Sequence, residues 1–167
     1  MTAHEHAYSA LVEWNGNTGT GTATYAGYAR SYRVHVSGKR DLELSADPAF
    51  RGDPTRHNPE DLFLTAVSAC HMLFYLALCA RERIPVVAYT DQAEAILRMD
   101  ASGGGRFEAI SLHPRVTIAD ASQRELAAAL HRVAHEQCFI ANSCSSPITC
   151  DAVIQAAECR TEAGWTT

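Results

Sequence analysis

Two cysteines stand in sequence contexts that could support redox chemistry. Cys70 lies in the middle of an uncharged run from Leu62 to Ala80, which contains no Asp, Glu, Lys or Arg. Cys138 lies far downstream, at the end of the segment Ala134-His135-Glu136-Gln137-Cys138. A cysteine thiolate attacks peroxide oxygens and disulfide sulfurs, so a thiol on a helix with a capped, acid-bearing start is placed for such reactions.

The reactivity of Cys70 depends on a cation that its own helix does not supply. Free cysteine is among the most buried residue types, so an isolated cysteine is more often an inert core thiol than a nucleophile. Apolar surroundings keep a thiol protonated, and a working thiolate needs a nearby positive charge. The cation must therefore come from the loops before the uncharged run, where Arg30, Arg51 and Arg56 are available.

Glu60 has two interpretations. It stands in Asn58-Pro59-Glu60-Asp61, which predicts the start of a helix, since Asn is a good N-cap and Pro suits the first helical position. An acid in this first turn favours the helix dipole by about 0.3–1 kcal/mol. Alternatively, Glu60 orients an arginine toward the thiolate through a bidentate pair. Spacing alone favours the first interpretation.

A second kind of chemistry is metal binding near Cys138. His131, His135 and Cys138 follow an H-x3-H-x2-C pattern that places them on one helix face, with Cys144 nearby. The pattern lacks the paired-cysteine spacing of structural zinc sites. Six cysteines allow fifteen full pairings, so spacing does not select a disulfide.

Bulk properties favour one domain, residues 1–167, without a nucleic-acid or membrane partner. The 167 residues carry a net charge of −5, the pI is near 5.9, and no basic stripe is present. The first residues lack a basic start followed by an apolar core, which argues against a signal peptide. We therefore expect a cytoplasmic protein with reduced thiols.

The pattern of elements predicts an α+β fold in which antiparallel sheets pack on a long central helix. The main helix is expected from Pro59 to about Arg83, and a second helix from Ser122, with Glu125 as its capping-box acid, to about Gln137. A loop is expected over residues 47–57. Strands are expected at 8–14 and 21–28, in a hairpin at 32–36 and 41–44, in a long hairpin at 86–99 and 107–118, and at 148–158.

The long helix is apolar on every side, which predicts a partner for it. The stripe that includes Cys70 consists of Leu62, Phe63, Ala66, Ala69, Cys70, Leu73, Phe74 and Ala77. One sheet covers only one side of such a helix, so a second copy of the chain is the simplest cover for the other side. A membrane span is the less favoured explanation, because Thr65, Ser68 and His71 interrupt the run.

Three segments together resemble the OsmC/Ohr family of thiol-dependent hydroperoxide reductases. They are Asn58-Pro59-Glu60-Asp61-Leu62-Phe63, Ser68-Ala69-Cys70-His71-Met72 and Ala134-His135-Glu136-Gln137-Cys138. The predicted order of elements also matches, so the resemblance covers nearly the whole chain. His-Met after the first cysteine is similar to the OsmC-like branch.

The resemblance implies an OsmC-like fold, an intertwined homodimer and two active sites at its interface. It implies that Cys70 is the peroxidatic and Cys138 the resolving cysteine, and that Glu60 holds the catalytic arginine. Arg51 is the preferred arginine and Arg30 the second candidate. Phe139 stands where the family more often has proline, and Cys144 adds a nearby thiol, so the resolving partner stays open.

The implied activity is reduction of alkyl or fatty acid hydroperoxides by an external thiol or lipoyl-type dithiol, without a metal or organic cofactor. Two alternatives remain: a catalytically silent protein that binds an apolar ligand, and a zinc-binding structural protein. The remaining cysteines, which are Cys79, Cys144, Cys150 and Cys159, are expected to be small core or surface residues.

Overall fold

The computed structural model describes residues 5–157, which form two compact units. The first unit ends at Phe63 and the second begins at Leu64. Glu158, the expected end of the last strand, and Cys159 lie outside the described residues.

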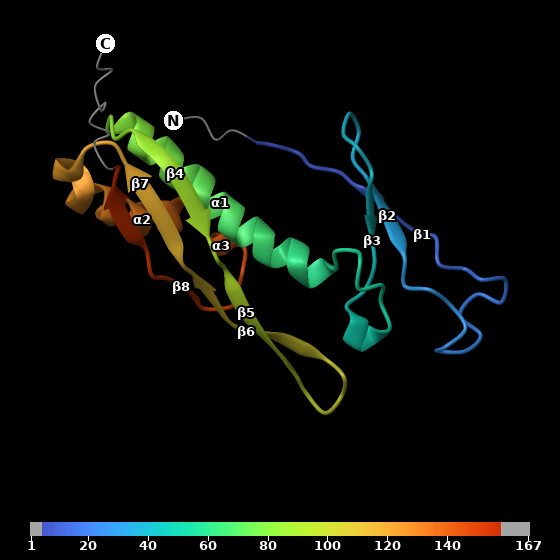
Figure 1. Ribbon diagram of the computed structural model, residues 1–167. Coiled ribbons are helices and arrows are strands. Elements are labelled where there is room, and N and C mark those ends of the chain that lie inside the picture. Colours follow the sequence, from blue (N-terminus) through green and yellow to red (C-terminus); the bar gives the residue numbers. More distant parts are fainter. Residues whose placement is uncertain (1–4, 158–167) are drawn as a thin grey trace, which may run out of the picture. The chain divides into compact units, whose positions relative to one another are not determined.

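The first unit contains a three-stranded antiparallel sheet in the order β1-β2-β3 (Figure 1). Its strands are β1 (Leu11–Trp14), β2 (Tyr32–His35) and β3 (Leu42–Leu44). The predicted hairpin is confirmed, because β2 and β3 pair with Val34 opposite Leu42. Gly38, at φ 76°, supplies the left-handed backbone of its turn. The loop over residues 47–57 contains one 3-10 turn, η1 (Pro48–Phe50).

The prediction of a strand at residues 21–28 is wrong. This segment forms turns, and they begin at Asn17, whose side-chain oxygen accepts hydrogen bonds from the backbone N–H groups of Gly19 and Gly21 at 2.9 and 3.0 Å. Both glycines have positive φ angles, 115° and 56°. Asparagine and glycine thus hold a turn where the Thr and Tyr content favoured a strand.

The long helix α1 (Pro59–Arg81) starts as the sequence predicts and ends two residues earlier. Asn58 Oδ1 accepts a hydrogen bond from Asp61 N at 2.8 Å, and Asp61 Oδ2 accepts one from Asn58 N at 3.3 Å. At the other end, Arg83 has φ 58° and Ile84 N donates to Cys79 O at 2.8 Å. This is a Schellman ending, in which a left-handed residue satisfies the last carbonyls.

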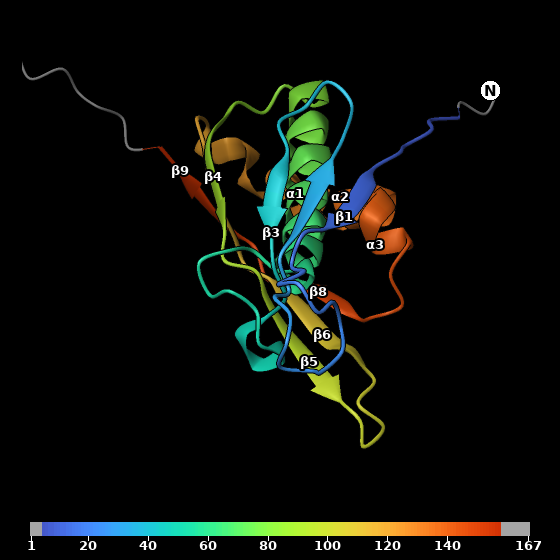
Figure 2. The same ribbon diagram turned by 90° about the vertical axis from the view of Figure 1, so that its right-hand side faces the viewer.

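The long hairpin of the second unit is confirmed, but each arm is broken in two. Strand β4 (Val86–Asp91) pairs with β7 (Pro114–Ile118), and β5 (Glu94–Met99) pairs with β6 (Gly105–Leu112). At the break, the Asp91 carboxylate accepts hydrogen bonds from His113 N at 2.7 Å and from Ser68 Oγ at 2.5 Å. Beyond it, β5 and β6 extend past β8 (Ile148–Cys150) and away from the helices (Figure 2).

The predicted last strand is two short strands that complete two sheets. Strand β8 pairs in parallel with β6, and β9 (Val153–Ala156) pairs in parallel with β7. The sheets therefore have the orders β4-β7-β9 and β5-β6-β8 and are mixed rather than wholly antiparallel. The α+β class is confirmed.

The second predicted helix is α2 (Arg124–Gln137), and the predicted cap at Ser122 is wrong. Asp120 accepts hydrogen bonds from Ser122 N and Ser122 Oγ, which folds η2 (Ala121–Gln123) before α2 begins. A four-residue helix, α3 (Phe139–Asn142), follows α2 after Cys138.

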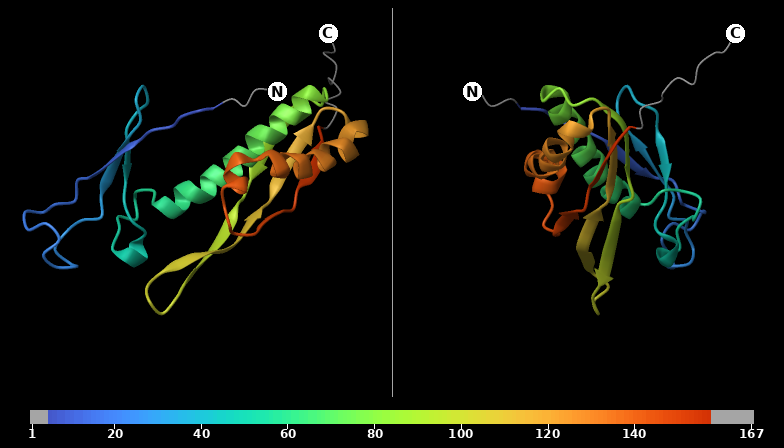
Figure 3. Two further views of the ribbon diagram at one scale, coloured as in Figure 1. Left: turned by 180° about the vertical axis from the view of Figure 1, so that it is seen from behind. Right: turned by 60° about the vertical axis from the view of Figure 1, so that its left-hand side comes forward.

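The core of the second unit lies where α1 and α2 cover one face of the β4-β7-β9 sheet (Figure 3). The residues of α1 that are buried are Val67, His71, Tyr75, Leu78 and Cys79. The predicted stripe through Cys70 is therefore not the packing face. None of its members is buried, and Leu73 is 62% exposed while Leu78 is only 9% exposed.

By length and composition, α1 is the one helix within residues 5–157 that could cross a membrane. This is weak evidence, because the core helix of a soluble protein passes the same test.

Candidate active site

The structure brings Cys70 and Cys138 together within the second unit. Cys70 lies in the middle of α1 and is half-buried, and Cys138 lies between α2 and α3 and is 1% exposed. The two side chains lie close enough for Cys70 to shift the pKa of the Cys138 thiol. Both are free thiols. Two sulfurs in contact can close a disulfide with little rearrangement.

The local fold of Cys138 explains its depth. Its backbone N–H donates to His135 O at 3.2 Å and closes α2, while its sulfur accepts a hydrogen bond from Ala141 N at 3.4 Å and caps α3. Burial, together with the neighbouring Cys70 side chain, raises the pKa of the Cys138 thiol to about 11. The Ala141 and Ile140 N–H groups oppose this shift. Cys138 is therefore a thiol at neutral pH.

Aromatic rings stand beside the thiol pair. Phe74, one turn after Cys70, packs edge to face on Phe139, the residue after Cys138, with centroids 4.9 Å apart and an angle of 85° between the ring planes. Phe139 is largely exposed. The surface next to the thiols is thus apolar, which suits an alkyl group better than a charged one.

Arg30, Arg51 and Glu60 belong to the first unit and Cys70 to the second, so their roles toward Cys70 stay predictions. Within its own unit Arg30 is fully occupied. Its guanidinium donates to the carbonyls of Tyr28 and Tyr25 at 2.5 and 2.6 Å and lies over both rings, 3.9 and 4.4 Å from their centroids. Arg56 is likewise paired, with Glu43 and Asp53.

Arg51 differs from Arg30 and Arg56 in that its backbone is constrained while its side chain is unpaired within residues 5–63. It has φ 67° and follows η1, and Gly52 after it is indispensable, because a Cβ there would lie 1.6 Å from Ala46 O. The backbone is thus fixed while the Arg51 side chain is exposed and makes no hydrogen bond or ion pair within residues 5–63. Glu60 Oε2 is buried and has no hydrogen-bond partner among the described residues. A free guanidinium and an unpartnered carboxylate oxygen are the groups that an arginine–glutamate pair requires.

A second cluster lies on another side of α1 and was not predicted. His71 on α1, His131 on α2 and Cys150 on β8 present their polar atoms to one another. His71 Nε2 is 2.9 Å from His131 Nδ1, and Cys150 Sγ is 3.7 and 3.9 Å from these two nitrogens. The histidines are 1% and 5% exposed.

All three groups of this cluster are held uncharged. Burial lowers the pKa of His71. Burial, and to a smaller extent the charge of the neighbouring His71, lowers the pKa of His131 to about 3. Burial raises the pKa of Cys150 to about 11, and Asp91 and Asp151 add to the shift. The remaining nitrogens, His71 Nδ1 and His131 Nε2, are buried without partners among residues 5–157. Each such group costs about 1–3 kcal/mol.

The candidate metal ligands His131, His135 and Cys138 do not converge as a set among the described residues. His131 turns to His71 and Cys138 to Cys70, and the group of potential ligands that converges in the described part of the chain is His71, His131 and Cys150. Helical periodicity puts His71 on one face with Val67 and Tyr75, but it does not show that this face is the buried one. No sequence spacing could have shown that Cys150 meets it.

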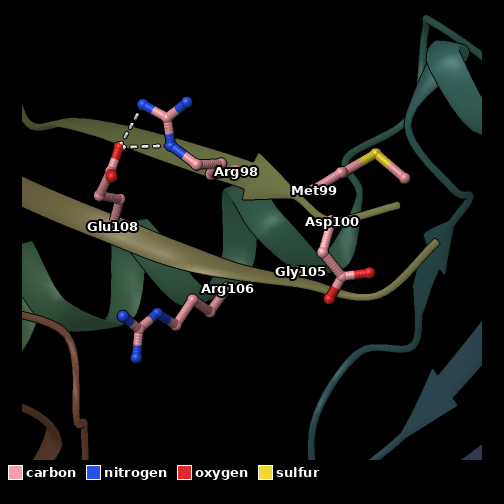
Figure 4. Close-up of a pocket in the computed structure, with 6 residues that line it drawn as sticks. All are labelled: Arg98, Met99, Asp100, Gly105, Arg106 and Glu108. Atoms are coloured by element: carbon pink, nitrogen blue, oxygen red, sulfur yellow. Dashed lines mark hydrogen bonds and ion pairs between the residues drawn. The ribbon is translucent and has the colours of Figure 1, made fainter. Parts of the chain in front are cut away.

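The tip of the β5–β6 hairpin carries a pocket of about 290 Å³ that Figure 4 shows in detail. Arg98 and Glu108 form an ion pair across the strands at 2.7 Å, and Arg106 points to the other side. A solvent-exposed ion pair of this kind contributes little to stability and provides no reactive group.

Comparisons with known proteins point to one family. A sequence model of the family described as "OsmC-like protein" matches residues 52–153. An OsmC-like protein of unknown function from Vibrio cholerae has a similar structure, with 30% identity and a TM-score of 0.79 over 89% of this chain and 100% of that one. No curated protein matches the sequence.

Two further similar structures are named for hydroperoxide resistance. The organic hydroperoxide resistance protein OsmC from Legionella pneumophila has 19% identity and a TM-score of 0.66, over 92% of this chain and 99% of that one. An organic hydroperoxide resistance protein from Elizabethkingia anophelis has 18% identity and the same TM-score, over 93% and 100%. At this identity the likeness concerns the fold.

Proposed function

The chain belongs to the OsmC-like protein family, and from that premise we propose that it is a thiol-dependent peroxidase for organic hydroperoxides. Cys70 is the peroxidatic and Cys138 the resolving cysteine. The observation that carries the proposal is the contact between a half-buried thiol and a fully buried one. The names of two similar structures, which mention organic hydroperoxide resistance, support it.

In the first step the Cys70 thiolate attacks the distal oxygen of the hydroperoxide. The O–O bond breaks, the alkoxide takes a proton and leaves as the alcohol, and Cys70 becomes a sulfenic acid. Cys70 suits this role because it is the more exposed of the two sulfurs. Phe74 and Phe139 provide an apolar surface for the alkyl chain of the substrate.

In the second step the Cys138 sulfur attacks the sulfenic sulfur, water leaves, and a Cys70–Cys138 disulfide forms. An external dithiol of the lipoyl type, or another thiol, then reduces this disulfide and is itself oxidised to a disulfide. These steps use two cysteines and the external reductant, and no metal or organic cofactor takes part.

Arg51 is the arginine that we assign to Cys70, with Glu60 as the residue that orients it. The free guanidinium of Arg51 and the unpartnered Glu60 Oε2 support this choice. Arg30 is the weaker candidate, since two carbonyls and two tyrosine rings already engage it. A guanidinium beside the sulfur favours the thiolate over the thiol.

We also propose that the protein acts as a homodimer in the cytoplasm. The α1 face with Cys70, Leu73 and Phe74 is apolar, and the second unit covers it only in part, since Leu73 is 62% exposed and Cys70 and Phe74 are half-buried. A second copy would bury it without a membrane or a nucleic acid as partner.

The test is turnover of cumene hydroperoxide by the reduced protein with dihydrolipoamide as reductant. We expect consumption of the peroxide and, without reductant, one Cys70–Cys138 disulfide per chain, identified by mass spectrometry of peptides. If no thiol supports turnover and Cys70 stays reduced, the peroxidase proposal is wrong.

An apolar pocket on α1, in the turns that follow Cys70, supports one other function. It has a volume of about 190 Å³ and is lined by Leu73, Phe74, Ala77, Leu78 and Arg81. A silent protein that holds an apolar ligand would use this pocket. Native mass spectrometry that finds a retained lipid, together with an unreactive Cys70, would favour that alternative.

A further inference from the structure

The cluster of His71, His131 and Cys150 has the geometry of a metal site. Three elements supply one donor atom each, and the three atoms lie within 4.8 Å of one another. Zn–N bonds of about 2.05 Å and Zn–S bonds of about 2.3 Å place tetrahedral ligand atoms about 3.3 Å apart for two nitrogens and about 3.6 Å for nitrogen and sulfur. The observed separations are 2.9, 3.7 and 3.9 Å. The nitrogen–nitrogen distance must therefore lengthen by about 0.4 Å and the nitrogen–sulfur distances shorten by about 0.1–0.3 Å. The two rings, which lie 11° from parallel, must also turn toward the ion.

We propose that His71, His131 and Cys150 bind a zinc ion at a site separate from the Cys70–Cys138 pair. Two imidazoles and a thiolate form a donor set of intermediate softness, which Zn²⁺ prefers over the oxygen ligands that Mg²⁺ and Ca²⁺ require. Three protein ligands leave the fourth position for water or for a further side chain.

The site has a route for the ion. A pocket of about 430 Å³ is lined by His131 and Cys150 and also by His135 and Asp151. An ion can enter from solvent through this pocket, and His135 stands at it as a further nitrogen donor. Access of this kind separates a usable metal site from a sealed group of polar side chains.

The charges around the cluster favour a cation. Asp91 and Asp151 lie close enough to Cys150 for their negative charges to act on its sulfur. Asp91 is fixed by its hydrogen bonds from Ser68 Oγ and His113 N. A dication bound to one thiolate and flanked by two carboxylates would have its charge more than offset, which reduces the penalty of placing it at this depth.

The ring nitrogens of His71 and His131 have few hydrogen-bond partners among the described residues. Across the 2.9 Å contact the two imidazoles can share only one proton, and their other nitrogens have no partner within residues 5–157. Tyr75 stacks on the His131 ring at 3.8 Å between centroids and holds its plane. A metal ion at this position would engage the facing nitrogen of each ring, Nε2 of His71 and Nδ1 of His131.

The test is titration of the full, reduced, chelator-treated chain with Co²⁺ alone, followed by Zn²⁺. We expect one Co²⁺ per chain, with a thiolate-to-cobalt charge-transfer band that Zn²⁺ removes. Cys150→Ser should abolish the band and weaken metal binding at least about 100-fold. Removing a residue that only orients a metal ligand already lowers metal affinity about 10–100-fold. Cys144→Ser is the matched control, because Cys144 is half-buried as Cys150 is and its sulfur forms hydrogen bonds with Ser146; it should keep the band.

The double variant Cys70→Ser, Cys138→Ser should also keep the band. Loss of the band in this variant together with its persistence in Cys150→Ser would assign the metal to the thiol pair and overturn the proposal, as would the absence of 1:1 binding. X-ray absorption of the zinc-loaded natural chain tests the site without any variant. It should give one sulfur at about 2.3 Å and two or three N/O ligands at about 2.0 Å, and two sulfurs would contradict the assignment.

Discussion

Cys70 and His71 are neighbours in the sequence, yet they lie in two different environments of the second unit. Cys70 is half-buried beside Cys138 and two aromatic rings, on the side of α1 that the unit covers only in part. His71 is buried against α2 and β8 and meets His131 and Cys150. Successive residues of a helix point about 100° apart, so one helix can support two centres.

Cys138 and Cys150 have similar pKa values but different neighbours. Burial raises the pKa of both Cys138 and Cys150 to about 11. Cys138 faces another thiol, whereas Cys150 faces two imidazoles and the field of two carboxylates. The depth of a cysteine therefore sets its protonation, and its neighbours decide whether it serves for disulfide exchange or for metal binding.

The largest expected effect is the loss of hydroperoxide turnover when Cys70 is replaced. Cys70→Ser should lower hydroperoxide turnover at least about 1,000-fold, because it removes the nucleophile. Cys79→Ala, on the same helix but buried in the core, is the matched control and should keep turnover while lowering stability. Steady-state peroxide consumption measures the turnover of both variants. Equal losses in the two variants would contradict a special role for Cys70.

A smaller effect is expected from the second thiol. Cys138→Ser should lower turnover with a dithiol about 100-fold while the first peroxide is still reduced, since only the resolving step is lost. The sulfenic acid at Cys70 should then accumulate and react with dimedone. Cys144→Ser should resolve normally. If instead Cys144→Ser blocks the disulfide and Cys138→Ser does not, Cys144 is the resolving residue.

The two faces of α1 can be compared by a matched pair of substitutions. Leu78→Ala removes a core side chain and should lower the free energy of unfolding by about 2–5 kcal/mol. Leu73→Ala should cost a similar amount, and its cost should depend on protein concentration, because a second copy covers that face in the proposed dimer. Light scattering that gives 18.1 kDa, with a Leu73→Ala cost below about 1 kcal/mol, would remove the dimer from the proposal.

The raised pKa of Cys138 predicts a pH dependence of disulfide formation. Below a pKa of about 11 the thiolate fraction of Cys138 rises tenfold per pH unit. The conversion of sulfenic acid to disulfide should therefore accelerate about tenfold per unit between pH 6 and pH 9, measured by acid quench and mass spectrometry after a peroxide pulse. A rate that does not change with pH would show that Cys138 is already a thiolate.

The smallest effect should distinguish the two arginines. Arg51→Lys keeps a positive charge but loses the bidentate geometry, and it should slow peroxide reduction about tenfold. Arg30→Lys should change the rate less than Arg51→Lys does, because Arg30 is engaged by Tyr25 and Tyr28. The reverse order of rates would make Arg30 the activating residue.

Much of the fold could be predicted because its signals are local. Asn58 and Pro59 start α1 by capping, Gly38 turns the first hairpin, and segments rich in β-branched and aromatic residues form the long one. The errors arose where short-range hydrogen bonds outweighed propensity. Asn17 and its glycines turned residues 21–28 away from a strand, and Asp120 capped the turn that Ser122 was expected to cap.

The sequence by itself determined the α+β class, the long apolar helix and, through the contexts of Cys70 and Cys138, the family. Only the tertiary structure decided which face of α1 is buried, since a helix that is apolar on all sides carries no periodic signal to choose one. The same holds for the meeting of Cys150 with His71 and His131. Their separations along the chain are 79 and 19 residues, so packing of β8 against two helices, and no local pattern, brings them together.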